Sequence, residues 1–185
     1  MKPGLLLHHC CAPCSVRVIS GVAEQFDVQS FWFNPNVQPQ AENVKRRISL
    51  EGLVQKNGLQ LYYGPEYPQD EWIEIAKALG PERCAFCYSL RLRETAKKAR
   101  SLGLEYFSTS LLASPYQKHD LIKETGLSAA KEEGVKFHYA DFRPFYYEGK
   151  AEAAKQGYYM QKYCGCLFSK EERERQKQAA KVKAV

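Results

Sequence analysis

Residues 4–14 read GLLLHHCCAPC, and the strand–helix rhythm of the whole chain starts here. The apolar run from Leu5 to His9 is typical of a buried strand, and it leads directly into three cysteines. From Cys14 to Phe26, apolar residues recur at helical spacing. We therefore expect a buried strand, a cysteine-bearing turn and a helix in immediate succession.

Strands and helices alternate from this unit to the end of the chain. Further strands are expected at residues 28–33, 59–63, 106–112 and 135–140. Further helices are expected at residues 42–57, 70–79, 84–102, 118–133 with a break near Gly126, 151–160 and 169–182. Such alternation predicts a single α/β domain over residues 1–185, with a parallel-type sheet flanked by helices on both faces. The residues from about 170 to 185 are expected to form a C-terminal basic helix or tail.

The composition suits a protein of the cytoplasm. The chain has 185 residues, enough for one full hydrophobic core. Its apolar start is too short for a signal peptide, and no stretch approaches the roughly 20 apolar residues of a membrane span. We therefore expect a cytoplasmic protein with no membrane partner. In that reducing compartment, clustered cysteines serve more often as metal ligands or catalytic thiols than in structural disulfides.

All seven cysteines fall in three tight clusters, which are Cys10, Cys11 and Cys14, then Cys84 and Cys87, then Cys164 and Cys166. The first two clusters each contain a C-x-x-C pair at the start of an expected helix, where both sulfurs share one face. Two such pairs supply the four thiolates that a zinc ion or an iron–sulfur cluster requires. The fifth thiol suggests a second metal or a ligand on the substrate side. The alternative for each pair is buried, inert cysteine.

Several polar residues follow directly after expected strands. His9, Cys10 and Cys11 follow the first strand, and residues 34–36 follow the second. Residues 110–114 close the fourth strand, and Asp141 follows the fifth. Because ligands bind beyond the carboxyl ends of parallel strands, we expect these residues to meet at one edge of the sheet. Asp141 could equally be a helix cap. His8 and His9 alternate across the strand, so only one of them can face the cysteines.

The sequence Cys164-Gly165-Cys166 predicts a different kind of site. A disulfide between cysteines separated by one residue closes a small, strained ring that opens easily on reduction. The glycine lets the backbone bend far enough to close it. We interpret the pair as a redox-active dithiol, with a further pair of metal ligands as the alternative.

The net charge of +6 is distributed unevenly. Residues 81–100 hold six Lys/Arg against two Glu, and the last 25 residues hold seven against three acidic residues. This bias permits a nucleic-acid partner, but solvated helix faces would explain it equally well. The side chains of Arg91, Arg93, Lys97 and Lys98 would form a basic face beside the metal. Tyrosines near the third cysteine pair could stack on unpaired bases or pack in the core.

Five motifs in this order resemble one known family. They are HCCAPC at residues 9–14, NPN at 34–36, ERCxxCY at 82–88, DFR at 141–143 and QKYCGC at 161–166. Together they closely resemble the QueH family of epoxyqueuosine reductases, and the match extends from residue 5 to about residue 170. The resemblance implies a sheet like that of the PP-loop and HUP-like nucleotide-binding folds. No Ser-Gly-Gly phosphate loop is present, so ATP use is not carried over.

The resemblance also implies a reaction. Enzymes of this type reduce the epoxide of epoxyqueuosine to the alkene of queuosine in the tRNA anticodon loop, without cobalamin. They carry a [4Fe-4S] cluster with a further iron close by. The electron donor is not identified by the sequence. The second electron that the reaction needs would be stored on the further iron or in the dithiol.

Residue roles follow from the same resemblance. Cys10, Cys11, Cys84 and Cys87 correspond to the cluster ligands, although spacing alone would favour Cys11 and Cys14 as a pair. Cys164 and Cys166 correspond to the redox-active pair, as a disulfide or as metal ligands in the resting state. Candidate ligands of a second iron are Cys14, Asp141 and His9, and Asp141 is also a candidate catalytic residue.

Two rival functions remain open on the sequence. A zinc-stabilised RNA-binding module without catalysis explains the C-x-x-C pairs and the charge, but it leaves a surplus thiol and the last pair without a role. A metal-free thiol oxidoreductase would use C-x-x-C chemistry alone. The colour of the protein after anaerobic purification distinguishes iron from zinc.

Overall fold

The expected parallel sheet is present in the computed structural model, which describes residues 1–182. Its strands are β1 (Gly4–His8), β2 (Asp27–Trp32), β3 (Leu61–Tyr63), β4 (Tyr106–Thr109) and β5 (Lys136–Phe137). They lie in the order β3-β2-β1-β4-β5, and every neighbouring pair is parallel. This is the strand order of open Rossmann-type sheets, which agrees with the expected nucleotide-binding type of fold.

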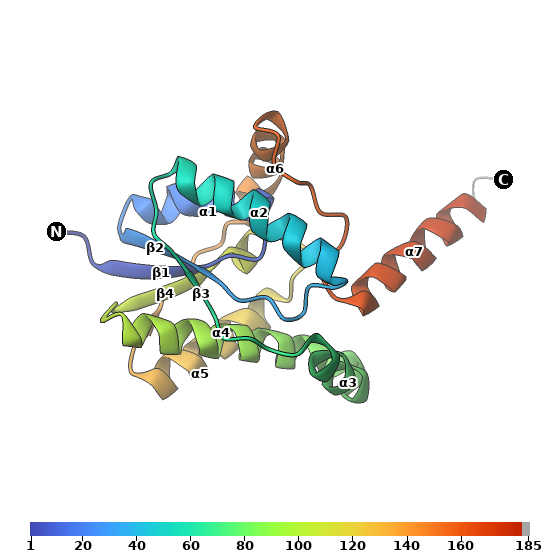
Figure 1. Ribbon diagram of the computed structural model, residues 1–185, viewed down its shortest axis with the longest axis horizontal. Coiled ribbons are helices and arrows are strands. Elements are labelled where there is room, and N and C mark those ends of the chain that lie inside the picture. The colour runs from blue at the N-terminus through green and yellow to red at the C-terminus, as the bar shows by residue number, and fades with distance from the viewer. Residues whose placement is uncertain (183–185) are drawn as a thin grey trace.

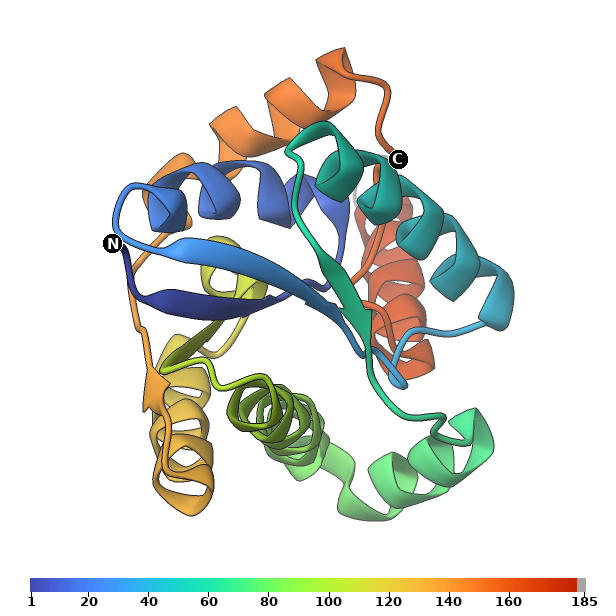
Figure 2. The same ribbon diagram turned by 60° about the vertical axis from the view of Figure 1, so that its left-hand side comes forward.

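Helices cover both faces of the sheet (Figures 1 and 2). The helices α1 (Ala12–Ala23), α2 (Gln40–Lys56) and α6 (Tyr146–Lys155) lie on one side. The helices α3 (Gln69–Leu79), α4 (Arg83–Ser101) and α5 (His119–Glu133) lie on the other. The expected C-terminal basic helix is α7 (Leu167–Val182), which projects away from the body, and the expected tail from 183 onwards lies outside the described residues.

The first strand forms the centre of the core. Leu5, Leu6 and Leu7 are fully buried because β1 is paired on both edges and covered on both faces. The strand order reverses between β1 and β4, so the turns after these two strands diverge and leave room beyond their carboxyl ends. No helix of the described residues is long and apolar enough to cross a membrane.

The fourth strand is shorter than expected. It ends at Thr109 and not at Leu112, because the Thr109 hydroxyl accepts a hydrogen bond from the Leu111 amide at 3.2 Å. This bond turns Ser110–Ala113 into a short 3₁₀ helix, η2. The fifth strand is also short and covers Lys136–Phe137 of the expected 135–140.

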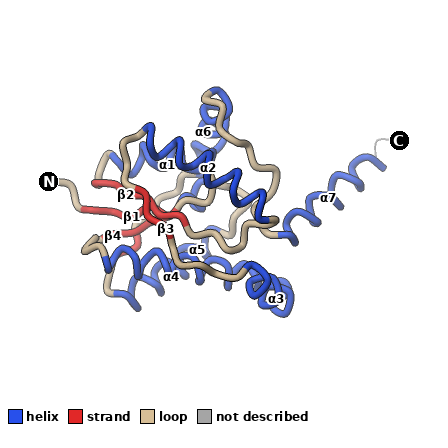
Figure 3. The backbone as a smooth tube through the Cα atoms, viewed as in Figure 1, coloured by secondary structure: helices blue, strands red, loops and turns tan. Residues whose placement is uncertain are grey.

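Two expected helix features are wrong. α5 is not broken near Gly126, since the glycine is buried in the helix and lets it approach β5. A Cβ at position 126 would lie 2.4 Å from the Phe137 ring. α6 covers Tyr146–Lys155 and not 151–160, because it starts directly after the turn η3 (Arg143–Phe145) and Gly157 takes a left-handed φ of 76°. Figure 3 shows the loop that then leads to α7.

Candidate metal centre

Three buried thiols converge in the turn between β1 and α1. The sulfurs of Cys10, Cys11 and Cys14 all lie within 4.8 Å of one another, and Cys10 Sγ is 3.7 Å from Cys11 Sγ. Cys11 is the N-cap of α1, and Pro13 in the first turn fixes the backbone there. Within residues 1–182, no other set of three His, Cys, Asp or Glu side chains converges in this way. The chemistry of this donor set suits a thiophilic metal.

Hydrogen bonds hold this thiol group in place from two distant segments. The Cys10 amide donates to Ser110 Oγ at 2.9 Å, and the Ser110 hydroxyl donates to Cys10 Sγ at 3.3 Å. Gln161 Nε2 donates to Cys11 Sγ at 2.8 Å. The short η2 turn therefore brings Ser110 to the first cysteine, and the segment before α7 brings Gln161 to the second.

The three thiols differ in the direction of their pKa shifts. Hydrogen bonds from the Cys11 and Cys14 thiols lower the pKa of Cys10 well below its usual range. Burial and the neighbouring Cys10 raise the pKa of Cys11, and hydrogen bonding to Cys10 and Cys11 raises that of Cys14. A buried group that stabilises one thiolate among three sulfurs is ready to bind a cation.

His8 and His9 have different hydrogen-bond partners. His8 is a satisfied core residue, since its ring nitrogens contact Thr109 Oγ1 at 2.9 Å and the Phe33 carbonyl at 3.1 Å. His9 Nδ1 lies 2.8 Å from Ser15 Oγ, whose hydroxyl donates to the Cys11 carbonyl. Nδ1 must therefore carry the proton, which leaves the buried Nε2 of His9 as a lone pair without a partner.

A second set of thiols forms where α4 begins. Cys87 and Cys166 pack in one buried cluster with Trp72. Burial raises the pKa of Cys87 to about 12, and the charges of Cys164, Cys166 and Cys84 add to this effect. The second and third cysteine clusters of the sequence therefore lie beside each other in space.

Arg91 donates a hydrogen bond to a thiol of the second set and lies within electrostatic reach of Cys10 in the first. Its guanidinium donates from Nη2 to Cys87 Sγ at 3.1 Å and from Nη1 to Asn34 Oδ1 at 3.5 Å. Burial opposes its charge, but Cys87, Cys164 and Cys10 raise the pKa of Arg91. Arg91 is 2 % exposed, so it does not belong to the basic face that the sequence suggested.

The rest of that predicted basic face is largely neutralised. Arg93 forms an ion pair with Glu132 of α5, and Lys97 with Glu94. Lys98 Nζ lies 4.9 Å from the centre of the Tyr62 ring. The exposed surface of α4 is therefore a mixed-charge face.

A buried arginine positions the Cys164-Gly165-Cys166 loop. Arg46 donates to the carbonyls of Cys164 at 2.8 Å and Tyr163 at 3.0 Å, and it pairs with the buried Glu42. Gly165 has a φ of 151°, and a Cβ there would lie 3.0 Å from Val37 and 3.1 Å from Asn36. Both cysteines of the loop are free thiols, as are the other five.

Asp141 lies on the surface. Its carboxylate accepts two hydrogen bonds from the Arg143 guanidinium and one from the Arg143 amide at 3.0 Å. These bonds lower the pKa of Asp141 to about 2. The amide that donates to Asp141 is the first of the turn η3, although the N-cap residue of that turn is Phe142.

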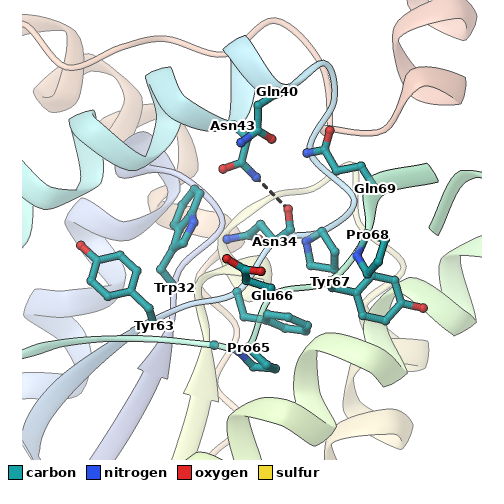
Figure 4. A pocket seen from close by; sticks show the side chains of 13 residues that line it. Trp32, Asn34, Gln40, Asn43, Tyr63, Pro65, Glu66, Tyr67, Pro68 and Gln69 are labelled. Atoms are coloured by element: carbon teal, nitrogen blue, oxygen red, sulfur yellow. Dashed lines mark hydrogen bonds between the residues drawn. The ribbon is translucent and has the colours of Figure 1, made fainter. Parts of the chain in front are cut away.

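A solvent-open cavity lies beyond the carboxyl ends of β2 and β3 (Figure 4). It has a volume of about 410 Å³ and is lined by aromatic and amide side chains, among them Trp32, Tyr63 and Tyr67. Asn34 forms one wall, and its Nδ2 donates to the His9 carbonyl at 2.8 Å. Asn34 thereby separates this cavity from the cysteine-bearing turn.

An iron–sulfur group fits the residues around these thiols. Apart from the sulfurs, several buried polar atoms near the first and third cysteine clusters have no partner in the described residues, namely His9 Nε2, Asn36 Oδ1, Gln38 Nε2 and Gln161 Oε1. Buried polar atoms are rarely left unpaired, so they indicate space for a further group. The donors nearest to it are thiols, the ligands of iron–sulfur clusters and of zinc.

Sequence reasoning missed two residues of the site. Residues 110–114 were expected at this edge of the sheet, and Ser110 does contact Cys10. Gln161 stood in a quoted motif without a role, and its position before Cys164 could have identified it. Arg46 carried no signal, since a helical arginine is ordinarily exposed.

Comparisons with known proteins identify the family to which this sequence is similar. The family model described as epoxyqueuosine reductase QueH matches residues 5–172. A protein of Dehalococcoides mccartyi with that name is 39% identical over 174 residues, covering 94% of this chain and 96% of its own length. The relative from Thermotoga maritima is 39% identical with 91% of each chain covered, and that from Staphylococcus epidermidis is 32% identical, covering 91% of this chain and 76% of its own.

A solved structure shares the fold. The predicted subunit of a tRNA methyltransferase from Methanocaldococcus jannaschii superposes with a TM-score of 0.50 at 10% identity, over 82% of this chain and 76% of that one. At this identity the similarity concerns the fold alone. The matched family model and the relatives over nearly the full chain show that this protein belongs to the QueH family of epoxyqueuosine reductases.

Proposed function

We propose that this protein reduces the epoxide of epoxyqueuosine to the alkene of queuosine in tRNA, with iron–sulfur chemistry and without cobalamin. The observation that carries the proposal is the buried group of Cys10, Cys11 and Cys14 at the carboxyl end of β1. It lies where α/β sheets bind their ligands, in a chain that belongs to a family of epoxide reductases.

Cys10, Cys11, Cys84 and Cys87 are proposed to hold a [4Fe-4S] cluster. The convergence of Cys10 with Cys11 supports half of this set. Cys87 is supported by Arg91, whose guanidinium donates to the Cys87 sulfur and whose pKa is raised by the charge of Cys10. Cys14 remains the best-supported candidate for a second iron, and the free Nε2 of His9 supports it as another. Asp141 is the weakest candidate because Arg143 occupies its carboxylate.

The reaction needs two electrons and two protons. The epoxide oxygen leaves as water while the alkene forms, and a dithiol that becomes a disulfide supplies that number of electrons and protons. A bound cluster would supply electrons one at a time, and a second iron would act as a Lewis acid toward the epoxide oxygen. Cys164 and Cys166 are proposed as the dithiol, on a loop that Arg46 holds in place.

The tRNA anticodon loop is the proposed partner, together with an electron donor that remains to be identified. The projecting helix α7 supports an RNA partner, because it carries basic residues and stands away from the body. A long basic helix of this kind can follow a phosphate backbone.

The test is nucleoside mass spectrometry on tRNA that carries epoxyqueuosine. The protein is purified without oxygen, and the tRNA is incubated with it and a chemical reductant in cobalamin-free buffer. We expect queuosine to form in proportion to the iron content of the preparation. An iron-loaded protein that leaves epoxyqueuosine unchanged would exclude the proposed reaction. A zinc-loaded protein that only binds the tRNA would favour the RNA-binding alternative.

A further inference from the structure

Three tyrosines form an exposed aromatic cluster from two distant segments. Tyr116 follows η2, whereas Tyr146 and Tyr147 begin α6. The ring centre of Tyr146 lies 6.0 Å from that of Tyr116 and 5.2 Å from that of Tyr147, both in edge-to-face geometry. Tyr116 is 76 % exposed and Tyr147 is 69 % exposed. An exposed apolar cluster of this kind indicates a binding surface.

The cluster lies next to the thiols. α6 packs against the start of α1 at Gly149, where a Cβ would come within 3.4 Å of the Pro13 carbonyl oxygen. Burial raises the pKa of Tyr146, and the charge of Cys14 raises it further. On the other side, Gln117 follows Tyr116 in the chain and donates to Cys164 Sγ at 3.3 Å. The rings therefore flank both the first and the third cysteine clusters.

The charges around the cluster suit a polyanion. Both carboxylates of the neighbouring segment are neutralised, Asp141 by Arg143 and Glu148 by Arg17. Lys150 Nζ lies 5.5 Å from the centre of the Tyr146 ring, and Lys118 is exposed beside Tyr116. Neither lysine forms an ion pair with a described residue. A phosphate backbone would find the two lysines here, against the exposed carboxylate of Asp120.

We propose that Tyr116, Tyr146 and Tyr147 form a stacking platform for an unpaired base next to the modified nucleoside of the anticodon loop. Single-stranded RNA is recognised by stacking its splayed bases on aromatic side chains. Stacking there fixes the loop so that the nucleoside beside it faces the thiols. This inference rests on the proposed function, because it takes the anticodon loop as the substrate.

A purely structural role for the rings predicts something different. Tyr146 is half-buried and contributes to packing, but Tyr116 and Tyr147 are too exposed to stabilise the fold much. Replacing the two exposed rings should therefore leave the melting temperature nearly unchanged. Leu127 provides the control, because it is an apolar side chain that is 52 % exposed on α5, which covers the other face of the sheet from α6.

The experiment measures binding of an anticodon stem-loop RNA to Tyr116→Ala, Tyr147→Ala and the double variant. Each lost ring should weaken binding by about fivefold to a hundredfold. Tyr116→Phe and Tyr147→Phe should bind as the wild type does, since the ring is kept. Leu127→Ala should also bind normally. In turnover assays with tRNA, the weaker binding of the alanine variants should raise KM more than it lowers kcat.

Two further results separate this inference from the proposed function. If the double alanine variant binds the stem-loop as tightly as the wild type and still makes queuosine, the platform is wrong and the reductase stands. If the wild type binds the stem-loop through these rings but never makes queuosine, the reductase is wrong and the platform stands. A wild type that binds no stem-loop overturns the platform.

Discussion

Arg91 donates a hydrogen bond from its Nη2 to the sulfur of Cys87 across 3.1 Å, and both side chains are buried. No carboxylate of the described residues forms an ion pair with this guanidinium. A buried cation is costly unless an anion compensates it. The sulfurs within its electrostatic reach are those of Cys87, Cys164 and Cys10. Because burial raises the pKa of Cys87 to about 12, this sulfur becomes an anionic partner of Arg91 when it binds a metal.

Arg91→Met should lower the reduction potential of the bound cluster. The reduced cluster carries more negative charge, so a cation and a hydrogen bond to a ligand sulfur favour reduction. The variant loses both the cation and the hydrogen bond. The equilibrium constant for one-electron reduction of the cluster should therefore fall about tenfold, which lowers the potential by about 59 mV in a redox titration. Arg93→Met removes the same charge two residues along α4 from an exposed position and should change the potential little.

The metal-free protein provides a second measurement for Arg91. Loading the metal should raise the melting temperature more in the wild type than in Arg91→Met, because the buried cation gains its anionic partner only then. A residue with a purely structural role would shift both forms equally. Equal shifts together with an unchanged potential would show that Arg91 does not act on the centre.

Arg46→Ala should destabilise the protein by about 3–5 kcal/mol, because it leaves Glu42 buried without its cation. Arg47→Ala is the matched control on the same helix, since Arg47 forms a partly exposed pair with Glu51 and should cost about 0–1 kcal/mol. Urea unfolding of both variants measures the difference. Similar values for the two would show that the Arg46–Glu42 pair does not hold the loop.

Replacing Cys164 or Cys166 by Ser should abolish repeated turnover with a dithiol reductant. The loop would then lack one of the two thiols that store the electron pair. With dithionite kept in the reaction as a source of single electrons, the cluster of the variant can be reduced a second time, so queuosine formation should survive and is measured by mass spectrometry. Full multiple turnover by either variant with the dithiol reductant would exclude the dithiol relay.

Gly126→Ala should destabilise the protein by roughly 1–3 kcal/mol, since its Cβ would overlap the Phe137 ring at 2.4 Å. Gly52→Ala tests the same change in α2, where the nearest atom is 3.9 Å away. There the gain in helix propensity of up to about 1 kcal/mol should raise stability. Thermal unfolding of the two variants should give shifts of opposite sign, and shifts of equal sign would contradict the packing of α5 on β5.

The periodicity of the chain was enough to predict the architecture. The apolar run Leu5–His9 and the helical spacing after Cys14 reflect which side chains are buried. The alternation of strands and helices and the parallel sheet that these patterns predict are both present. The predicted boundaries of an element are wrong where a side chain competes with the backbone for a hydrogen bond. The Thr109 hydroxyl ends β4 early, and this competition is visible only once the backbone is folded.

The site was predicted less completely than the fold. Clustered cysteines and the strand-end rule point to the carboxyl edge of β1, where Cys10, Cys11 and Cys14 do converge. The packing of Cys87 against Cys166 could not be foreseen, because it depends on how the loop before α7 folds back onto α3 and α4. The burial of Arg91 was also hidden, since charge patterning assigns every helical arginine to the solvent.

The most direct test of the account is the content of iron and acid-labile sulfide in the protein after anaerobic purification. We predict a brown protein with about four sulfides per chain, and with about four irons for the cluster and one more when the proposed second iron is bound. Cys10→Ser and Cys87→Ser should each lose most of both. A colourless protein that carries zinc and no sulfide would contradict the account.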